Sequence, residues 1–462
     1  MKHSATKEVS ADQTPSQENK MRIMPIPKLL LSMSLPMMIS MLVQALYNIV
    51  DSIFVARINE NALTAVSLAF PVQNLMIAIA AGTGVGINAL LSRNLGEKSF
   101  KEADLAAKNG IFLAIVSYVI MAAIGAFGSY FFYAFQTQDK EILNYGIQYI
   151  TIVTVMSFGL FLQVIMERLL QATGKTFYSM ISQAAGAIIN TILDPIMIFG
   201  LCGFPRLGVA GAAMATVTGQ IAASFLGIYL NITKNSELNL SMKGFRPDRR
   251  VIGTIYKVGI PSIIMQSISS VMTFGMNKIL LTFSSTAAAV FGIYFKLQSF
   301  VFMPVFGLNN GIIPIIAYNY GARKKKRILS TIKLSIFTAV SIMLVGLAIF
   351  QLIPGQLLEL FDASEHMIEI GIPALRAISL SFIFAGYAIV CSSVFQALGN
   401  GVYSLVVSVA RQILIILPAA YAFSRLFGLD AVWWSIPLAE IVSVILSTIL
   451  FIRIKRMKID TL

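Results

Sequence analysis

Four polar residues within apolar stretches of the chain have the types and the spacing needed to hold a cation. Asp194 follows Asn190 by four residues, and Asp51 follows Tyr47 by four residues. Residues four apart share one face of an α-helix. Two carboxylates and an amide that converge away from water supply oxygen ligands for Na⁺. They can equally trap a proton, because burial and a like charge both oppose ionisation of a carboxyl group.

Each of these polar residues also has a structural explanation. The carboxylate of Asp194 precedes Pro195, so it can satisfy backbone groups that the proline leaves unpaired. Asp51 can instead pair with a buried lysine, and Asn190 can simply join two helices by a hydrogen bond. A functional role remains the leading hypothesis, because an ionisable group within an apolar, membrane-like environment is costly and usually marks a functional site.

Other charged residues also lie in apolar stretches. Glu167 can attract cationic compounds or carry protons, or it can pair with the neighbouring Arg168 or lie near the membrane interface. Lys296 and Arg411 are placed deeply enough that we expect them to pair internally. Other basic residues in such stretches are expected to extend to an interface.

The elements that must position these residues are transmembrane helices. The chain has 462 residues, of which 57% are hydrophobic and only 12% charged, whereas a soluble domain has about 25% charged residues. Apolar stretches that can span a bilayer, which needs about 20 residues, fall at roughly 27–55, 62–91, 104–128, 142–170, 177–202, 208–232, 252–283, 286–318, 328–353, 367–397, 402–424 and 428–454. We therefore predict an all-α integral membrane protein with twelve transmembrane helices.

The distribution of basic residues predicts the orientation of these helices. An even number of spans places both termini on one side. Lys and Arg, which account for the net charge of +14, gather on that side, as in Arg323–Arg327. This pattern is typical of cytoplasmic loops and not of a nucleic-acid site. We predict cytoplasmic termini and four regions: a disordered tail (1–25), an amino-terminal six-helix lobe (26–232), a cytoplasmic linker (233–250) and a carboxy-terminal six-helix lobe (251–462).

The two predicted lobes are copies of each other at a constant offset. Pro36 matches Pro261, and the other pairs with the same separation of 225 residues are Phe70 and Phe295, Gln73 and Gln298, Gly82 and Gly307, Gly86 and Gly311, Asn94 and Asn319, Gln171 and Gln396, and Tyr178 and Tyr403. Six helices in each copy make a parallel repeat. Such folds commonly bind substrate between the lobes and alternate its access to the two sides.

The sequence excludes several other classes of function. The two cysteines, Cys202 and Cys391, form no recognisable metal motif, and the two histidines, His3 and His366, lie in polar segments. No phosphate-binding loop of an ATPase is present. We therefore expect neither an enzyme nor a structural metal or other cofactor, apart from a coupling ion.

The order and spacing of eight short motifs carry a family resemblance. They are SLPMMIS (34–40), Tyr47-x-x-x-Asp51, LLQATG (169–174), NTILDPIMIFG (190–200), GVAGAAMAT (208–216), GIPS (259–262), IIPIIAYNYGA (312–322) and FQALGN (395–400). Over its whole membrane region the chain resembles multidrug and toxic compound extrusion (MATE) transporters, most closely the MepA-like bacterial branch. The resemblance implies a V-shaped protein in the bacterial inner (cell) membrane. It also implies cation-driven export of varied, often cationic, organic compounds, an activity that confers antibiotic resistance.

The resemblance also implies roles for individual residues. Coupling to H⁺ or Na⁺ would use Asp51, Asn190, Asp194, Thr216 and Tyr47, and Pro36 matches a proline at which the first helix bends in some relatives. Thr216 can alternatively be a helix-packing hydroxyl. The branch has a glutamate at the position of Glu167. Apart from the resemblance, the 22 Met and 31 Phe residues suit an adaptable cavity, although most of them are expected to face lipid or pack in the core. Weaker candidates for the substrate cavity are Met41, Gln44, Phe70 and Gln73.

The acidic cluster is not repeated in the second lobe. Asp51, Asn190 and Asp194 overlay on Met276, Ile415 and Ala419, which places the predicted coupling site in the amino-terminal lobe. We expect a monomer whose partners are small organic substrates and membrane lipid. The alternative functions are a flippase for a lipid-linked precursor and an exporter of a natural metabolite.

Overall fold

The predicted fold class is confirmed by a computed structural model, which describes residues 18–361 and 363–462. Ten helices in the described residues are long and apolar enough to cross a membrane, and two bent pairs raise the number of spans to twelve. The first six spans are α2 (Ile26–Ala56), α3 (Glu60–Gly96), α4 (Phe100–Gln136), α5 with α6 (Lys140–Val155 and Phe158–Ala172), α7 (Thr176–Phe199) and α8 (Val209–Lys234).

The second six spans repeat this order. They are α9 (Arg249–Leu281), α10 (Ser285–Gly321), α11 (Lys325–Leu352), α13 with α14 (Glu365–Ser379 and Phe382–Ala397), α15 (Gly401–Val409) with η2 (Ala410–Ile416) and α16 (Leu417–Leu426), and α17 (Leu429–Val432) with α18 (Ser435–Ile454) and η3 (Lys455–Ile459). The bent pairs, α5 with α6 (44°) and α13 with α14 (47°), occupy equivalent places in the two copies. Short elements outside the spans are α1 (Lys20–Ile23), η1 (Leu201–Gly203) and α12 (Pro354–Glu359).

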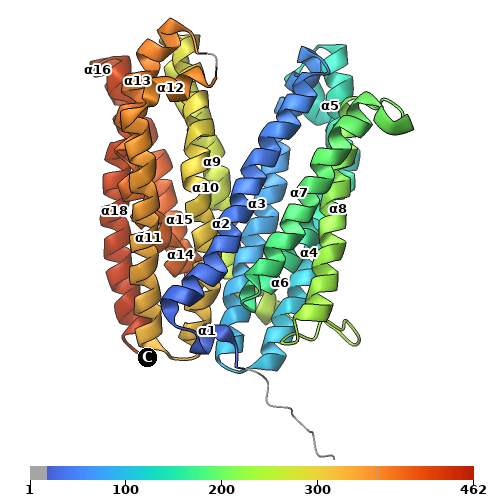
Figure 1. Ribbon diagram of the computed structural model, residues 1–462, viewed down its shortest axis with the longest axis vertical. Helices are drawn as coiled ribbons and strands as arrows, with labels where there is room; N and C mark the ends of the chain where they lie inside the picture. The colour runs from blue at the N-terminus through green and yellow to red at the C-terminus, as the bar shows by residue number, and fades with distance from the viewer. Residues whose placement is uncertain (1–17, 362) are drawn as a thin grey trace, which may run out of the picture.

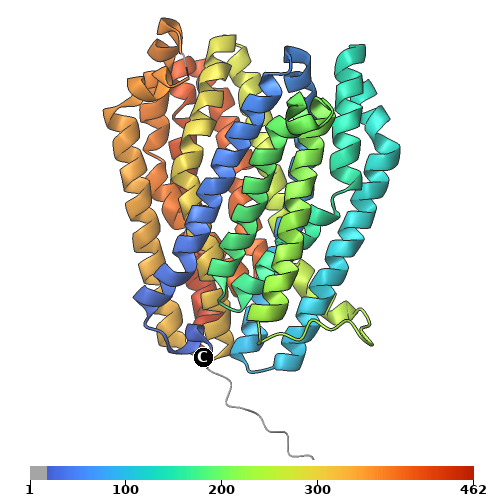
Figure 2. The same cartoon turned by 45° about the vertical axis from the view of Figure 1, so that its right-hand side comes forward.

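The spans form two lobes that diverge from one end of the molecule. Helices α2 to α8 make one lobe and α9 to α18 the other, and the lobes meet at the end where α1 and the carboxy terminus lie (Figure 1). We call this the basal end and the opposite end the open end. The same arrangement turned by 45° shows α2 crossing obliquely along the front of the other helices (Figure 2).

Glycines of the internal repeat allow the lobes to approach closely. A Cβ atom at Gly86 of α3 would overlap the backbone of Ile255 in α9, and one at Gly311 of α10 would overlap Ser34 in α2. Gly307 stands in the same relation to Met38. Small residues let helix backbones pack closely in membranes. The glycines that revealed the repeat are therefore contact points across the interface between the lobes.

The end of the predicted disordered tail is instead ordered. The predicted tail (1–25) also includes residues 1–17, which lie outside the described residues. From Lys20 to Ile23 the chain forms α1, and Met21 is fully buried. The Met21 carbonyl accepts hydrogen bonds from Asn319 Nδ2 (3.2 Å) and Arg327 Nη2 (2.9 Å). The prediction was wrong here because these partners are about three hundred residues away in the sequence.

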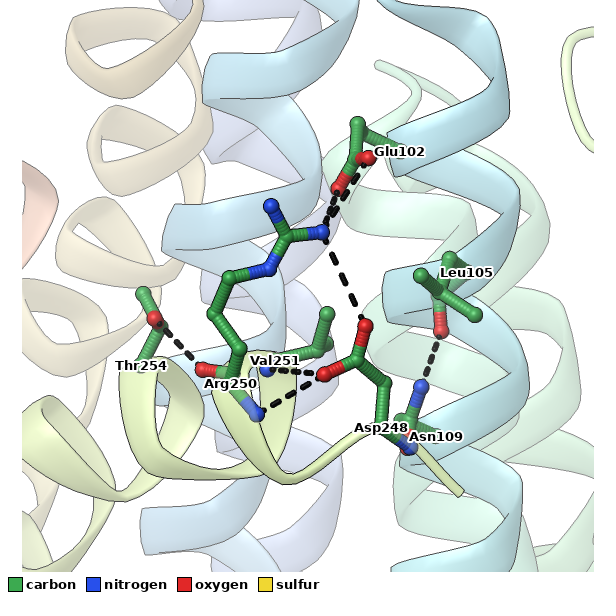
Figure 3. A network of polar contacts seen from close by, with 7 residues as sticks. All are labelled: Glu102, Leu105, Asn109, Asp248, Arg250, Val251 and Thr254. Carbon is green, nitrogen blue, oxygen red and sulfur yellow. Dashed lines mark hydrogen bonds and ion pairs between the residues drawn. The ribbon is translucent and has the colours of Figure 1, made fainter. Parts of the chain in front are cut away.

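The start of the second lobe is tied to the first lobe at the basal end. Asp248 caps α9 by accepting a hydrogen bond from the backbone N–H of Arg250 (2.8 Å), and its own N–H donates to Asn109 Oδ1 in α4 (3.1 Å). Arg250 also pairs with Glu102 of α4 at 3.2 Å (Figure 3). Because the Arg250 side chain is 70% exposed, this ion pair contributes little to stability.

Candidate functional site

Glycine contacts between α7 and α8 bring the predicted coupling residues together. The buried positions Gly186, Asn190 and Asp194 recur every four residues along α7 and define the face that packs inward. A Cβ atom at Gly219 of α8 would lie 2.6 Å from the Gly186 carbonyl oxygen. This close approach sets Thr216, one turn away on α8, beside Asn190.

The predicted residues form one buried cluster. Asn190 Nδ2 donates a hydrogen bond to Thr216 Oγ1 at 3.2 Å and lies 3.5 Å from Asp194 Oδ1. The carboxyl group of Asp194 on α7 lies close enough to that of Asp51 on α2 for the two to interact electrostatically. Tyr47 lies close enough to both carboxyl groups to interact with them electrostatically. Sequence spacing on two separate helices therefore identified groups that meet in space.

The cluster leaves several buried oxygen atoms without a hydrogen-bond partner. Within the described residues these atoms are Asp51 Oδ1, Asn190 Oδ1 and Asp194 Oδ2, and Asp194 has no exposed surface. Buried polar atoms normally have partners, because leaving one unsatisfied costs about 1–3 kcal/mol. A bound proton or a small cation would satisfy these oxygens, so the donor set fits either ion.

The structural explanations considered for these residues fare differently. Asn190 does join two helices, because it donates to Thr216, and this contact coexists with the cluster. The neighbour of Asp51 is a second carboxyl group, Asp194, which is the opposite of the lysine partner considered from the sequence. Two ionised carboxyl groups this close together repel each other and destabilise the fold unless one of them is neutralised.

Sequence reasoning missed Tyr149 of α5. This tyrosine is buried, accepts a hydrogen bond from Gln73 Nε2 at 2.9 Å, and lies within electrostatic range of Asp51 and Tyr47. It connects Gln73, a weak cavity candidate, to the buried cluster around Asp51. The only sequence signal for Tyr149 was its place on an amphipathic stretch, which marks many packing residues equally.

The remaining cavity candidates lie elsewhere along α2 and α3. Gln44 accepts a hydrogen bond from Gln183 Nε2 of α7 (3.0 Å), and Gln183 in turn accepts one from Ser40. Met41 is half-buried and Phe70 is exposed. The helix α2 continues through Pro36 without a break from Ile26 to Ala56, and the role of this proline in bending stays a prediction.

Glu167 and Arg168 are both buried in α6, but they do not pair with each other. Glu167 Oε1 accepts a hydrogen bond from Gln163 Nε2 at 2.9 Å. Arg168 Nη1 donates to Gln171 Oε1 at 2.9 Å and to Asn310 Oδ1 of the other lobe at 2.8 Å. The ion pair considered from the sequence is therefore replaced by bonds to neutral amides.

The two basic residues expected to pair inside the second lobe behave differently. Arg411, in the π-helical segment η2, pairs with the buried Glu440 of α18 at 2.7 Å, as predicted. The prediction for Lys296 is wrong, because its side chain is exposed and lies over the ring of Phe361. Lys296 occupies an exposed face of α10, and the hydropathy of the sequence does not show which face of such a helix is exposed.

Comparison of this sequence with known proteins identifies the family to which the chain belongs. A family model described as MatE matches residues 36–196 and 261–422, which cover most of both lobes. The chain belongs to the MATE family of transporters. It is 30% identical over 436 residues to the multidrug export protein MepA of Staphylococcus haemolyticus, covering 94% of this chain and 95% of that protein. The MepA protein of Staphylococcus aureus (strain NCTC 8325) is 27% identical, with coverage of 95% and 96%.

Solved structures of the MATE family have the same fold. One is described as the outward-facing conformation of a multidrug resistance MATE family transporter; it matches with a TM-score of 0.90 and 26% identity and covers 97% of this chain and 99% of that chain. The chain is thus a multi-pass membrane transporter and not an enzyme. These matches extend across both lobes, so they include the helices that carry the cluster.

Proposed function

We propose that this transporter is a secondary antiporter that exports organic, often cationic, compounds in exchange for H⁺ or Na⁺. The observation that carries the proposal is the cluster of buried, unsatisfied oxygens at Asp51, Asn190 and Asp194 in the described part of the chain. Thr216 and Tyr47 complete its surroundings. The MepA relatives described as multidrug exporters support the class of substrate.

The coupling mechanism that we propose uses the position of Asp51 on α2. A proton or Na⁺ bound between Asp51 and Asp194 cancels the repulsion between two carboxylates and changes how α2 packs on α7. The same helix contacts α10 of the other lobe, where Met38 packs against Gly307. Ion binding on one side of α2 therefore acts on the interface between the lobes on its other side.

We propose that the basal end faces the cytoplasm of a bacterial cell. Basic residues cluster at that end in the turns after α3 and α10 and at the carboxy terminus, including Lys98, Arg323 and Arg456. Such residues are typical of cytoplasmic loops. With this orientation the lobes diverge toward the outside, as in the outward-facing relative. Substrate would be drawn from the cytoplasm or the membrane, with Glu167 attracting cationic compounds.

The test is ion-driven transport in proteoliposomes. Ethidium efflux is measured under an imposed pH gradient and, separately, an imposed Na⁺ gradient, for the native protein and for Asp51→Asn and Asp194→Asn. We expect each variant to lose at least about 90% of gradient-driven efflux, because an amide cannot exchange a proton and binds cations weakly. Glu102→Gln, which alters an exposed carboxylate, is the matched control and should retain efflux.

The outcomes separate the alternatives. Unchanged efflux in both aspartate variants contradicts the proposed site. Failure of the native protein to respond to either gradient contradicts antiport and favours the flippase. Transport of a metabolite with no transport of ethidium would retain the mechanism and change the substrate.

A further inference from the structure

A buried chain of hydrogen bonds connects the second lobe to the helix that carries the proposed ion site. Asn310 of α10 accepts a hydrogen bond from Arg168 Nη1 (2.8 Å), which also donates to Gln171 Oε1 (2.9 Å). Gln171 Nε2 then donates to Ser179 Oγ of α7 at 2.9 Å. Ser179 lies three helical turns from Asn190 on the same helix. The chain therefore runs from one lobe, through α6, to the helix of Asn190 and Asp194.

The central member of this chain is Arg168, whose hydrogen-bond partners among the described residues are the neutral amides of Gln171 and Asn310. Arg168 is 9% exposed, and its Cγ atom fills the space beside Gly84, where a Cβ atom would lie 2.7 Å away. The adjacent acid, Glu167, is bonded to Gln163. A buried guanidinium that loses a hydrogen-bond partner is destabilised more than a neutral group would be. Movement of Asn310 away from Arg168 would therefore raise the free energy of the buried guanidinium group.

Separation of the lobes at the basal end must break this chain. Asn310 belongs to the lobe that moves away from α6, whereas Gln171 and Ser179 belong to the lobe of Arg168. A shift of α7 would act on Arg168 through Gln171. Arg168 is thus bonded directly to the other lobe, at Asn310, and indirectly to α7, through Gln171 and Ser179.

We propose that Arg168 is a positioning residue that couples the state of the ion site on α7 to closure of the lobes at the basal end. It stabilises the conformation in which the lobes diverge at the open end. When α7 shifts, Gln171 moves, Arg168 loses its alignment with Asn310, and the basal end opens. This inference deepens the proposed antiport, on which its link to the ion site rests.

A cysteine at position 34 reports basal opening directly. Ser34 of α2 is 3% exposed and packs on Leu308 and Gly311 of the other lobe. Ser34→Cys is introduced after Cys202→Ser and Cys391→Ser, which remove the native thiols. Its rate of labelling by a water-soluble thiol reagent is measured in inside-out vesicles, where the reagent reaches the basal face. This readout does not require transport.

The variants compare two arginines that bridge the lobes. Arg168→Gln should increase the labelling rate about tenfold or more, because a buried, charge-assisted hydrogen bond across the interface is lost. Arg168→Lys should give a smaller increase, because lysine keeps the charge without the planar fork. Arg250→Gln is the matched control and should change the rate less than about fivefold, because its ion pair with Glu102 is exposed.

The link to the ion site is tested by a double-mutant cycle. If Arg168 transmits the state of α7, Asp194→Asn alters the labelling rate in the native background but not when combined with Arg168→Gln. Folding of each variant is checked by size-exclusion chromatography in detergent. If Arg168→Gln does not fold, Arg168→Lys replaces it in the double-mutant cycle.

Three results overturn the inference or part of it. Equal labelling rates for the Arg168 variants and the native protein show that Arg168 does not hold the basal end closed. Equal effects of Arg168→Gln and Arg250→Gln show that burial of the contact is irrelevant. Additive effects of Asp194→Asn and Arg168→Gln show that no coupling to α7 exists. Failure of the antiport itself appears separately, as loss of gradient-driven efflux in the native protein.

Discussion

A methyl group added at Gly307 should force α10 away from α2. The protein should then leave the conformation in which the lobes diverge at the open end. The Cβ atom of Gly307→Ala would lie 2.5 Å from Met38 Cα, 2.6 Å from Met38 N and 2.7 Å from Met37 O, whereas ordinary contact begins at 3.4 Å. All three neighbours are backbone atoms, so no change of side-chain rotamer relieves the overlap. The two helices must separate, and they belong to different lobes.

The magnitude follows from the cost of overpacking. Inserting a methylene-sized group into a close-packed contact costs about 1–3 kcal/mol. A conformation in which the lobes are apart at this level avoids the cost. The equilibrium between the two conformations should therefore shift by about 5- to 150-fold toward the one that is open at the basal end.

Distances between the open ends of the lobes measure this shift. The native Cys202 is exposed at the open end of the first lobe, and Thr282 is exposed at the open end of α9 in the second. Spin labels at Cys202 and Thr282→Cys, with Cys391→Ser, give a distance distribution by pulsed electron resonance. Gly307→Ala should increase the short-distance population at the expense of the long one.

The same substitution elsewhere in α10 is the control. Gly292 has open space around the position of an added Cβ atom, so Gly292→Ala should leave the distribution unchanged. A folded Gly307→Ala variant with the native distribution would refute the reasoning, because it would show that the contact between α2 and α10 does not distinguish the two conformations.

Three further predictions concern contacts outside the proposed ion site. Arg327→Ala should increase amide hydrogen exchange in α1 at least tenfold, because its hydrogen bonds to the carbonyls of Met21 and Met24 are lost; native exchange rates would contradict this. Burial raises the pKa of Glu237, so the stability of the folded protein should fall as pH rises above 4.5. Glu237→Gln should remove this slope in thermal unfolding. Arg411→Met should cost about 3–5 kcal/mol by stranding a buried carboxylate, and adding Glu440→Gln should recover most of it; equal melting temperatures for the single and double variants would contradict this.

Local spacing was sufficient to predict the helices and most of the buried cluster that we propose as the ion site. Asn190 and Asp194 share a face because they lie four residues apart on one helix. Their meeting with Asp51 could be inferred because a charged residue at membrane depth needs a polar partner. The internal repeat predicted the two lobes, and its glycines lie at close contacts between them.

Contacts between distant parts of the chain could not be predicted in this way. The ordered segment at Met21 lies in a polar stretch of sequence, and Asn319 and Arg327 of the other lobe stabilise it by donating hydrogen bonds to the Met21 carbonyl oxygen. The partner of Arg168 was sought next to it in the sequence, at Glu167, and is found on the other lobe, at Asn310. Both errors have one cause: a hydrogen bond across an interface leaves no periodic signal in the sequence.

The duplicated interface supports our proposal that a single ion site acts on both lobes. The helix α2 contacts α10, and its repeat partner α9 contacts α3, with glycines at corresponding places. Only α2 carries an acid, Asp51, since α9 has Met276 at the equivalent position. In the proposed mechanism, one side of this pseudo-symmetric interface responds to an ion, whereas the other side is only a packing contact. Installing Met276→Asp would not restore the symmetry, because the positions equivalent to Asn190 and Asp194 are Ile415 and Ala419 and offer no side-chain oxygen.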